Sequence, residues 1–470
     1  MVDMMLRRTG MVLSALVCCV TAVGAEYYSD PAVPGGGDGS GGDPWPALKD
    51  CISNGSLATL QPGDTLYLRD GYHGYAQFTG ANSDFVTIAA QDGHTPLLAR
   101  LVITSAAKWH IKGLTISASL GNAYSGAMVS FCDSGSNNGQ IILEGCHIFG
   151  VDDHRGLDAA AWMGLNSGVL MGRHGVGSIV RDCHIRNTRF ALTMSAHDGI
   201  AEGNIIGAYS ADGIRMTRDG QRASDNVIKG AFVGSGDGDP NHDDAIQCFL
   251  FNVGTGTVRD IRVQRNLILG HDPDGEPLAA VNQAIGFFDG PLVNFVVEDN
   301  VINVSHWHGV SLYDAQGCTI ARNTVWNAFE NTFKPWVRLD NKLGLADGNT
   351  VTDNYAVSFH LDEPDTTASN NQPSTQAIFD AALTARSQEL FTRYSVYHCT
   401  SRRHRVTEEL ADGAIKRNIG LAVSPLPEAT IVVEHASAGS RILDGDGVDF
   451  IGLDRFGDHI LDLVGVAHDG

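Results

Sequence analysis

Basic residues, aromatic residues and cysteine motifs are all scarce in this chain of 470 residues. Lys and Arg total 32 against 54 Asp and Glu, and the net charge of −22 disfavours nucleic acid or an anionic membrane as a partner, because both need clustered positive charge. An acidic polymer would also be repelled, unless a cation bridges it. The nine cysteines form no CxxC motif, so neither a zinc site nor a dense disulfide framework is indicated.

Charged residues are also few, at 18% of the chain against a usual share of about 25%, whereas the 55 glycines exceed the usual share of about 7%. This profile favours a turn-rich β architecture over a helical one. Long apolar runs are missing except at the N-terminus, where two arginines precede the run Met11–Val23 and small residues form a cleavage site before Glu26. We therefore expect a signal peptide over residues 1–25, and a secreted, periplasmic or extracellular monomer with no membrane span.

One short motif recurs through the middle of the chain, with a charged or small pair before the aligned position and an apolar residue after it. The aligned positions are Cys146, Cys183, Asn204, Asn226, Asn266, Asn300, Asn323 and Asn354. The shortest intervals are 21 to 23 residues, which suits one turn of a parallel β-helix, and longer intervals hold loops. This pattern predicts an all-β parallel β-helix over residues 61–361 with an inward ladder of asparagines. The two aligned cysteines fit either a disulfide or two buried thiols.

The flanking regions differ from the repeats. Residues 26–60 are rich in Gly, Ser and Asp at first and then predict a short helix near residues 45–52, so we expect a lead-in and an N-terminal cap. The repeat stops near residue 362, and residues 374–392 have a helical pattern. We expect residues 362–470 to form a C-terminal extension or cap.

A second repeat precedes the aligned asparagines and has the alternation of a β-strand. Its inward positions are Leu192, Ile214, Ile246, Ile285 and Val310. Its outward positions are Thr193, Arg215, Gln247, Gly286 and Ser311. Because successive turns stack in register, the outward positions form one surface row along which a long polymer could lie.

The first turns of the predicted helix resemble a known group of proteins. The segments Gln61–Tyr72, Val86–Ala90 and Trp109–Ile116 are similar to the start of secreted right-handed parallel β-helix proteins, above all polysaccharide lyases of the alginate lyase and chondroitinase B type. The resemblance implies a right-handed β-helix and a uronate-containing polysaccharide as substrate. The Arg-His-Gly run that begins at Arg173 resembles a turn of the alginate lyases and implies a role for Arg173 at the substrate, whereas residues 151–155 lack the Asn-Lys-Ser element of that family.

The densest polar segment, residues 237–247, runs directly into the outward row. Oxygen-bearing side chains alternate along its first half, as in loops that bind Ca²⁺. The predicted calcium ligands are Asp237, Asp239, Asn241 and Asp243. A second acidic loop at residues 272–276 could complete such a site, and two solvated acidic loops are the alternative.

The second half of this segment supplies groups that can transfer protons. For β-elimination on a uronate, Arg215 or calcium would neutralise the carboxylate, His242 would remove the C5 proton and Tyr313 would protonate the leaving oxygen. Asp243 and Asp244 belong to the same predicted catalytic group. Turn stacking predicts that the substrate is held by Asp212, Gln247, His308, Lys334 and Arg338. A uronate epimerase would use similar groups.

The sequence thus predicts a secreted lyase that cleaves a uronate-containing polysaccharide by β-elimination, and two other functions remain open as alternatives. Asp212, Asp243 and Asp244 resemble the aspartates of polygalacturonase-type β-helix hydrolases, although the Arg-x-Lys element of that family has no match here. Hydrolysis needs two or three carboxylates with room for a water molecule. A β-helix that only binds glycans, as an adhesin does, is the alternative outside enzymology, because the fold alone specifies no chemistry.

Overall fold

The computed structural model describes residues 24–33, 35–135, 139–248, 256–270, 277–329, 332–361, 363, 365–401, 433–436 and 439–442. The predicted signal peptide lies almost entirely outside the described residues, as do the acidic loop at 272–276 and most of the region after residue 401. In that last region the structure describes β36 (Val433–Ala436) and β37 (Gly439–Ile442), which pair antiparallel.

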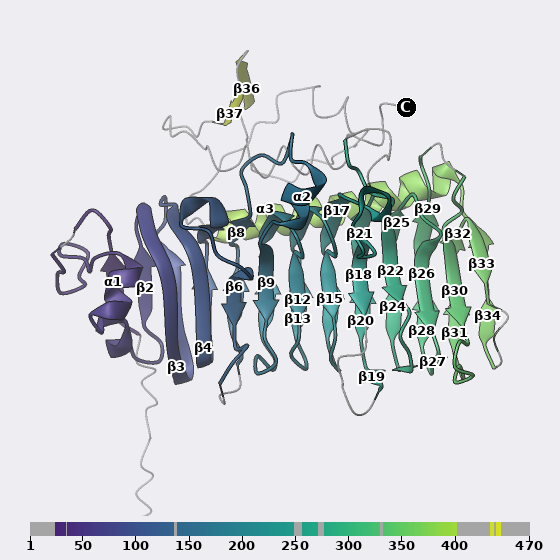
Figure 1. Cartoon of the computed structure of the whole chain (residues 1–470), viewed down its shortest axis with the longest axis horizontal. Helices are drawn as coiled ribbons and strands as arrows, with labels where there is room; N and C mark the ends of the chain where they lie inside the picture. The colour runs from purple at the N-terminus through teal and green to yellow at the C-terminus, as the bar shows by residue number, and fades with distance from the viewer. Residues whose placement is uncertain are drawn as a thin grey trace, which may run out of the picture.

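The described chain forms the predicted right-handed parallel β-helix (Figure 1). Each complete coil contains three short strands, and equivalent strands of successive coils pair in parallel, so three sheets run along the axis. In one of these ladders, for example, Ile214 pairs with Leu192 of the preceding coil and with Ile246 of the next. This register fixes the place of every side chain along the axis.

Three sheets, numbered here I to III, contain most of the strands. Sheet I consists of β6 (Ala127–Phe131), β9 (Ser167–Met171), β12 (Leu192–Met194), β15 (Ile214–Met216), β18 (Asp244–Cys248), β22 (Gln283–Phe287), β26 (His308–Tyr313), β30 (Trp336–Asp340) and β33 (Ser358–His360). Sheet II consists of β7 (Ile142–Glu144), β10 (Ile179–Arg181), β13 (Ile200–Glu202), β16 (Arg222–Ser224), β20 (Arg262–Gln264), β24 (Val296–Glu298), β28 (Thr319–Ala321), β31 (Thr350–Thr352) and β34 (Thr367–Ser369). Sheet III consists of β5 (Thr115–Ser117), β8 (His147–Phe149), β11 (His184–Thr188), β14 (Ile205–Tyr209), β17 (Val227–Ala231), β21 (Leu267–Leu269), β25 (Val301–Asn303), β29 (Thr324–Trp326), β32 (Tyr355–Ala356) and β35 (Gln372–Pro373).

The N-terminal end is closed by longer strands and a short helix. Here the chain forms β1 (Glu26–Ser29), β2 (Thr65–Leu68), β3 (Gly71–Ala90) and β4 (Pro96–Lys112), and each pairs in parallel with the next. The β-structure therefore begins inside the segment that was expected to be a lead-in. Between β1 and β2, α1 (Leu48–Ser53) buries Leu48 and Cys51 at the end of the core, close to the predicted helix, and η1 (Ser56–Thr59) follows it.

The predicted asparagine ladder is confirmed. The side-chain amide of Asn204 donates to the side-chain oxygen of Asn226 at 2.9 Å, and the same bond repeats from coil to coil through Asn266, Asn300, Asn323 and Asn354 to Asn371. The residue before each of these asparagines has a positive φ, between 53° and 65° in the six coils from Gly203 to Asp353. This left-handed residue turns the chain sharply between sheets II and III and directs the asparagine inward.

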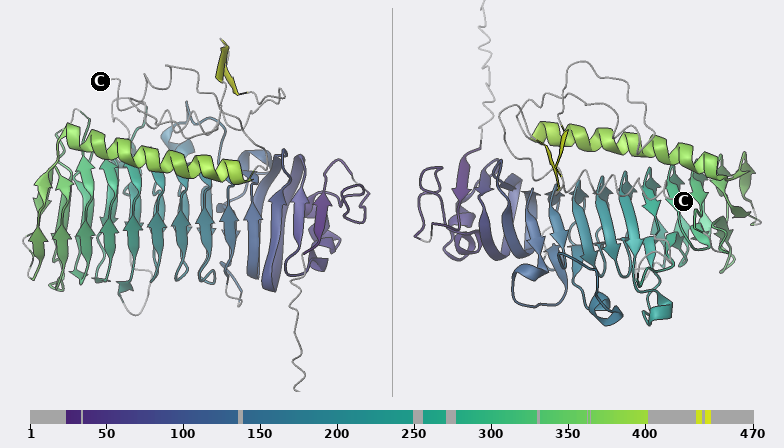
Figure 2. Two further views of the ribbon diagram at one scale, coloured as in Figure 1. Left: turned by 180° about the vertical axis from the view of Figure 1, so that it is seen from behind. Right: turned by 90° about the horizontal axis from the view of Figure 1, so that it is seen from above.

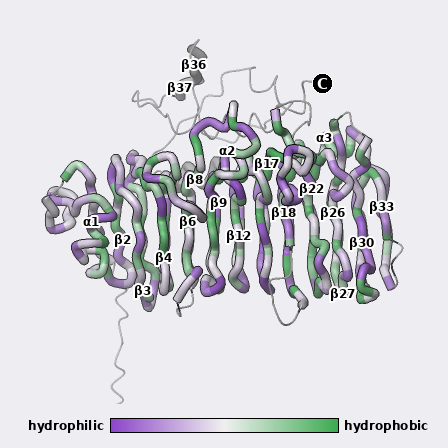
Figure 3. The backbone as a smooth tube through the Cα atoms, viewed as in Figure 1, coloured by the Kyte–Doolittle hydropathy of each residue, from purple (hydrophilic) through white to green (hydrophobic). Residues whose placement is uncertain are grey.

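The interior is one continuous apolar core. The predicted inward residues of sheet I are all fully buried, so the expected alternation is confirmed. Hydrophobic and hydrophilic positions are interleaved along the coils (Figure 3), as expected for strands with one face in the core. Cys146 and Cys183 both lie in this core as free thiols.

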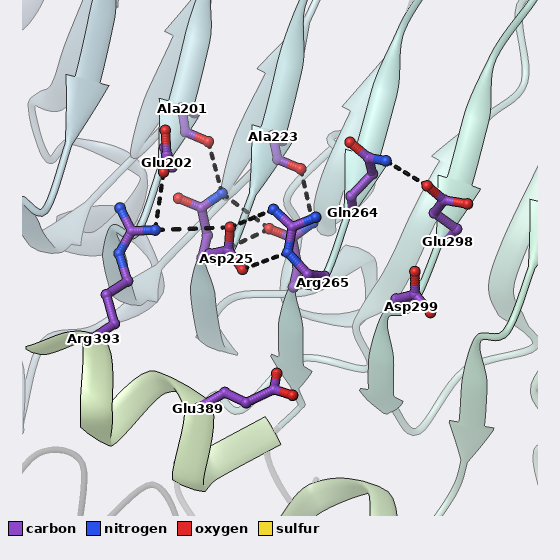
Figure 4. A network of polar contacts seen from close by, with 12 residues as sticks. Ala201, Glu202, Ala223, Asp225, Gln264, Arg265, Glu298, Asp299, Glu389 and Arg393 are labelled. Carbon is purple, nitrogen blue, oxygen red and sulfur yellow. Dashed lines mark hydrogen bonds and ion pairs between the residues drawn. The ribbon is translucent and has the colours of Figure 1, made fainter. Parts of the chain in front are cut away.

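The predicted C-terminal helix is confirmed as α3 (Gln376–Ser401), which runs along the outside of the coils on the side away from α2 (Ala159–Met163) (Figure 2). Its residues Phe379, Leu383 and Leu390 pack on apolar side chains of sheet III such as Val227 and Leu267. Arg393 of the same helix reaches the ladder of charges at the sheet II turns (Figure 4). No helix in the described part of the chain is long and apolar enough to cross a membrane.

Four short elements interrupt the coils on the outside. They are η2 (Ala118–Leu120), η3 (Ser235–Asp237), α2, and a small parallel sheet of β19 (Val258–Arg259), β23 (Leu292–Val293) and β27 (Ala315–Gln316). The helix α2 and the segment around η3 flank the outer face of sheet I (Figure 1), where the outward row lies.

Candidate active site on sheet I

Two aspartates stack at the start of adjacent sheet I strands. Asp212 and Asp244 each come two residues before a pair of aligned isoleucines, Ile214 and Ile246, so they occupy equivalent positions about 4.8 Å apart along the axis. Their stacking is visible in the hydrogen bonds, since the Asp244 backbone N–H donates to Asp212 Oδ1 at 3.3 Å. Asp243 lies directly beside them, and all three side chains are buried. We call these three residues the aspartate pocket.

Burial and mutual repulsion make all three carboxyl groups weaker acids than usual. The pKa of Asp212 is raised to about 6 by burial, which the neighbouring Arg215 partly offsets. Burial, together with Asp239 and Asp212, raises the pKa of Asp243 to about 9, and burial together with Asp212 and Asp243 raises the pKa of Asp244 well above its usual value. At neutral pH Asp212 is therefore mostly a carboxylate and Asp243 mostly a protonated acid, and the raised pKa of Asp244 favours its protonated form.

One guanidinium lies against the pocket. Arg215 Nε is 3.0 Å from Asp212 Oδ2, and its guanidinium carbon lies 4.1 Å from the ring centre of Phe190. Arg189 makes a separate bidentate pair with Asp239, in which Nη2 donates to Oδ1 at 2.9 Å and Nη1 donates to Oδ2. Although Arg189 is bonded to Asp239, its charge also favours the ionised forms of Asp212 and Asp243, so the pocket has Arg215 in direct contact with Asp212 and Arg189 at longer range.

The space around Asp244 depends on a glycine. Gln247 donates to Asp244 Oδ2 at 2.9 Å, whereas Asp244 Oδ1 and Asp243 Oδ1 have no hydrogen-bond donor among the described residues. Gly286 of the next coil lies under Asp244 Oδ1, and a Cβ at this position would be 2.4 Å from that oxygen. Buried acceptors without a donor are rare in structural cores and are typical of places that receive a ligand or a water molecule.

Polar side chains continue below and above the pocket. Asn282 donates to the hydroxyl of the buried Tyr209 at 3.2 Å, next to the three aspartates. The segment 235–242 covers the pocket from outside, because the Asn241 side-chain amide donates to Asp212 Oδ1 at 3.4 Å while His242 is exposed.

A cluster of rings lies on the coils that follow. It comprises Phe288, His306, Trp307, His308, Tyr313, Phe333, Trp336 and His360, which we call the ring platform. Burial, and then the neighbouring His242, lower the pKa of His306 to about 4. Burial and nearby positive groups, His306 first, lower the pKa of His308 to about 3. Both imidazoles are consequently neutral at neutral pH.

The structure brings some predicted site residues together and separates others. Asp212, Asp243, Asp244, Arg215 and Gln247 meet at the pocket, and His242 lies near His306 and His308. Tyr313 lies three coils from Arg215, because Arg215, Gln247, Gly286 and Ser311 are paired in succession. Three steps of about 4.8 Å place Arg215 and Tyr313 roughly 14 Å apart along the axis, too far to act on one sugar.

The remaining predicted substrate residues lie at the two ends of the row. Arg173 follows β9, three coils before Asp244, and lies beside Arg218. Arg338 is on β30, where it pairs with Asp340 and contacts the rings of Tyr313 and Trp336. Lys334 is exposed beside the ring platform.

The predicted calcium ligands do not fit a metal in this arrangement. Both carboxylate oxygens of Asp239 receive hydrogen bonds from Arg189, and Asn241 is turned toward Asp212. Among the described residues, no three His, Cys, Asp or Glu side chains are grouped so as to hold a metal ion.

Several residues of the site were not expected from the sequence. Arg189, Phe190, Tyr209 and Asn282 all contact the pocket or its partners. Phe190 could have been found from the repeat, because it occupies the position in the preceding coil that is equivalent to Asp212. Arg189 and its partner Asp239 are 50 residues apart, and no sequence pattern connects them.

No protein-family model and no curated protein matches this chain. Among solved structures, a mannuronic acid specific polysaccharide family 6 lyase from human gut microbiota is 14% identical, with a TM-score of 0.46 over 75% of this chain and 83% of the lyase. An alginate lyase from Paenibacillus sp. is 16% identical, with a TM-score of 0.41 over 70% of this chain and 95% of that enzyme. A polygalacturonase from Erwinia carotovora is 9% identical, with a TM-score of 0.33 over 75% of this chain and 94% of the polygalacturonase. The coil register itself identifies the chain as a right-handed parallel β-helix of the kind that the sequence resemblance implied.

Proposed function

We propose that this chain is a secreted glycoside hydrolase that cleaves a polysaccharide at the aspartate pocket. The observation that carries the proposal is the stacking of three buried aspartates around one arginine, which leaves protonated acids beside a carboxylate. Hydrolysis of a glycosidic bond needs both forms at once, one to donate a proton and one to accept one.

The roles follow from the acidities. Asp244, which stays protonated, donates its proton to the leaving oxygen as the bond from that oxygen to the anomeric carbon breaks. Asp212, the most acidic of the three, accepts a proton from the attacking water as the new carbon–oxygen bond forms. Arg215 keeps Asp212 ionised, and Asp243 adds to the repulsion that keeps Asp244 protonated. Proton return from Asp212 to Asp244 completes the cycle.

The direct test is the release of reducing ends from a panel of neutral and acidic polysaccharides. We expect Asp212→Asn and Asp244→Asn each to lower the rate about a hundredfold or more, since an amide neither donates nor accepts the required proton. Asp260→Asn, at an exposed aspartate that bonds Asn294, is the matched control and should keep full activity. An Asp244→Asn variant as active as the unmodified chain would refute the assignment.

The pH dependence gives a second readout. Since Asp212 must be ionised, kcat/KM should fall about tenfold per pH unit below a pKa of about 6. A rate that stays constant between pH 6 and pH 4 would exclude Asp212 as the base.

β-Elimination on a uronate is the second candidate, and one arrangement favours it. Neutral His308, Tyr313 and Arg338 all adjoin one another through ring contacts with Phe288 and Trp336. These residues could supply a base, an acid and a cation within two neighbouring coils. A lyase would produce an unsaturated product that absorbs in the ultraviolet, whereas the proposed hydrolase would produce reducing ends without that absorbance.

A further inference from the structure

We propose that the outer face of sheet I takes an uncharged polysaccharide, held on the ring platform beside the aspartate pocket, and not the uronate polymer that the sequence resemblance implied. This inference rests on the proposed hydrolase function for the place on that face where the polymer binds. It is carried by two independent features, the continuity of the rings and the pairing of the cationic side chains.

The ring platform is continuous. The Phe288 ring lies 4.8 Å from His308, which lies 5.1 Å from Trp336, and Trp336 lies 6.1 Å from Trp307 in a stacked arrangement with an interplanar angle of 17°. Trp307 is 47% exposed, the highest exposure of any tryptophan among the described residues, although such a large apolar side chain is normally covered. Aromatic faces of this kind suit the C–H-rich faces of sugar rings.

The polar edges of two of these rings point inward. Trp336 Nε1 donates to the Ser311 hydroxyl at 3.1 Å, and His308 Nδ1 lies 2.9 Å from the same oxygen. Ser311 is fully buried and lies on the outward row, two coils after Gln247. These bonds hold both rings in a fixed orientation under the exposed Trp307, which stacks on Trp336.

The charges argue against an acidic ligand. Three arginines lie beside the aspartate pocket and the ring platform, and each is already paired: Arg189 with Asp239, Arg215 with Asp212 and Arg338 with Asp340. Arg173 and Arg218 lie farther along the row, on the side of the pocket away from the rings. A uronate would have to compete with these carboxylates, and it would also approach the aspartate pocket. Lys334 adds one solvated charge, which in water stabilises an ion pair by at most about 1 kcal/mol.

The imidazoles of the ring platform add no positive charge that would attract an acidic ligand. Because burial keeps His306 and His308 neutral above pH 5, they offer hydrogen bonds and ring faces but no positive charge. An uncharged sugar can use both kinds of contact without any desolvation of a carboxylate.

The test measures binding without cleavage. The Asp244→Asn variant is titrated with matched pairs of polymers: mannuronan and linear mannan, polygalacturonate and its carboxyl-reduced form, and glucuronan and soluble linear glucan. We expect at least one neutral member to bind about tenfold more tightly than its acidic partner, at low and at high salt alike. Tighter binding of an acidic member, or no binding of any neutral member, would overturn the inference.

Variants separate the platform from the rest of the surface. Trp307→Ala should weaken the binding of the neutral polymer about tenfold, and Trp307→Phe should keep most of it, because the ring is retained. Phe391→Ala removes a ring that is 62% exposed on α3, on the other side of the molecule, and is the matched control. Equal losses in Trp307→Ala and Phe391→Ala would contradict a role for the platform.

The two proposals can fail separately. If the Asp244→Asn variant binds a neutral polymer through Trp307 but the unmodified chain releases no reducing ends from it, the hydrolase is wrong and the binding inference stands. If the unmodified chain cleaves a uronate polymer by hydrolysis through Asp244, the hydrolase stands and the inference about an uncharged substrate is wrong.

Discussion

Buried acidic groups occur on two faces of this β-helix, and their pKa values are shifted in opposite directions. At the sheet II face, Glu144 lies among His110, Lys112 and Arg181, and although burial opposes ionisation, hydrogen bonds from His110 and Arg181 and the charge of Lys112 hold its pKa well below the usual value. At the sheet I face, burial outweighs the charges of Arg215 and Arg189, and the pKa values of Asp212, Asp243 and Asp244 are raised. The first arrangement stabilises the fold, whereas the second sacrifices stability, as functional sites commonly do.

The same contrast continues along the molecule. Under α3, Asp225 accepts hydrogen bonds from Arg265 at 2.9 and 2.7 Å, and Arg393 donates to Glu202 at 3.0 Å (Figure 4). Every acid in this group has a guanidinium within reach. Charge compensation therefore distinguishes a structural ladder from a candidate active site on one and the same scaffold.

The largest expected effect is on the free energy of unfolding when Asp243 of the aspartate pocket is replaced. The pKa of Asp243 is about 9 in the fold and about 4 in an unfolded chain, so its contribution to stability is complete below pH 4 and is lost as the pH rises toward 9. Asp243→Asn should consequently raise the free energy of unfolding by roughly 2–4 kcal/mol at pH 8 and change it little at pH 4. Denaturant titrations at the two pH values measure this, and a destabilised variant at pH 8 would contradict the proposed charge state.

A smaller effect of opposite sign is expected on the other face. Glu144→Gln leaves Lys112 and Arg181 without their shared carboxylate and should lower the free energy of unfolding by about 2 kcal/mol at pH 7. Because the pKa of Glu144 in the fold lies well below its unfolded value, this loss should be complete above about pH 5, begin to fade below about pH 4 and vanish only as the pH reaches the much lower folded pKa. Catalysis should be unaffected, so a variant that is stable but inactive would break the distinction between the two faces.

The smallest expected effect tests how closely Gly286 must approach Asp244. In Gly286→Ala the new Cβ would meet Asp244 Oδ1 at 2.4 Å and the Phe288 ring at 2.6 Å, so both side chains must move away from it. We expect kcat to fall about tenfold, which corresponds to about 1.4 kcal/mol, with little change in the melting temperature. Gly207→Ala is the matched control, because a Cβ at Gly207 meets nothing within 4 Å.

Much of the fold could be predicted because it repeats. The spacing from Asn204 to Asn226 and the alternation around Ile214 recur in coil after coil, and each repeat reports the same local geometry. The site was predictable only where it belongs to the repeat, as Asp212, Asp244 and Arg215 do.

Contacts made by loops could not be predicted from the sequence. The oxygen pattern around Asp239 resembled a calcium loop, but a guanidinium 50 residues away already binds that carboxylate. The distance between Arg215 and Tyr313 depends on counting coils, and the intervals between coils vary with their loops. The sequence does not indicate whether an aromatic residue such as Trp307 faces the core or the solvent.

The asparagine ladder also constrains how such a chain can change in length. Each bond, such as that from Asn266 to Asn300, links equivalent residues of adjacent coils, so adding or deleting a whole coil leaves every other link of the series intact. A single inserted residue within the turn would instead misplace one amide and break the links on both sides of it. Duplication of a complete coil between the aspartate pocket and the ring platform would thus increase their separation by one step of about 4.8 Å without disturbing either cluster, so this separation can change only in discrete increments.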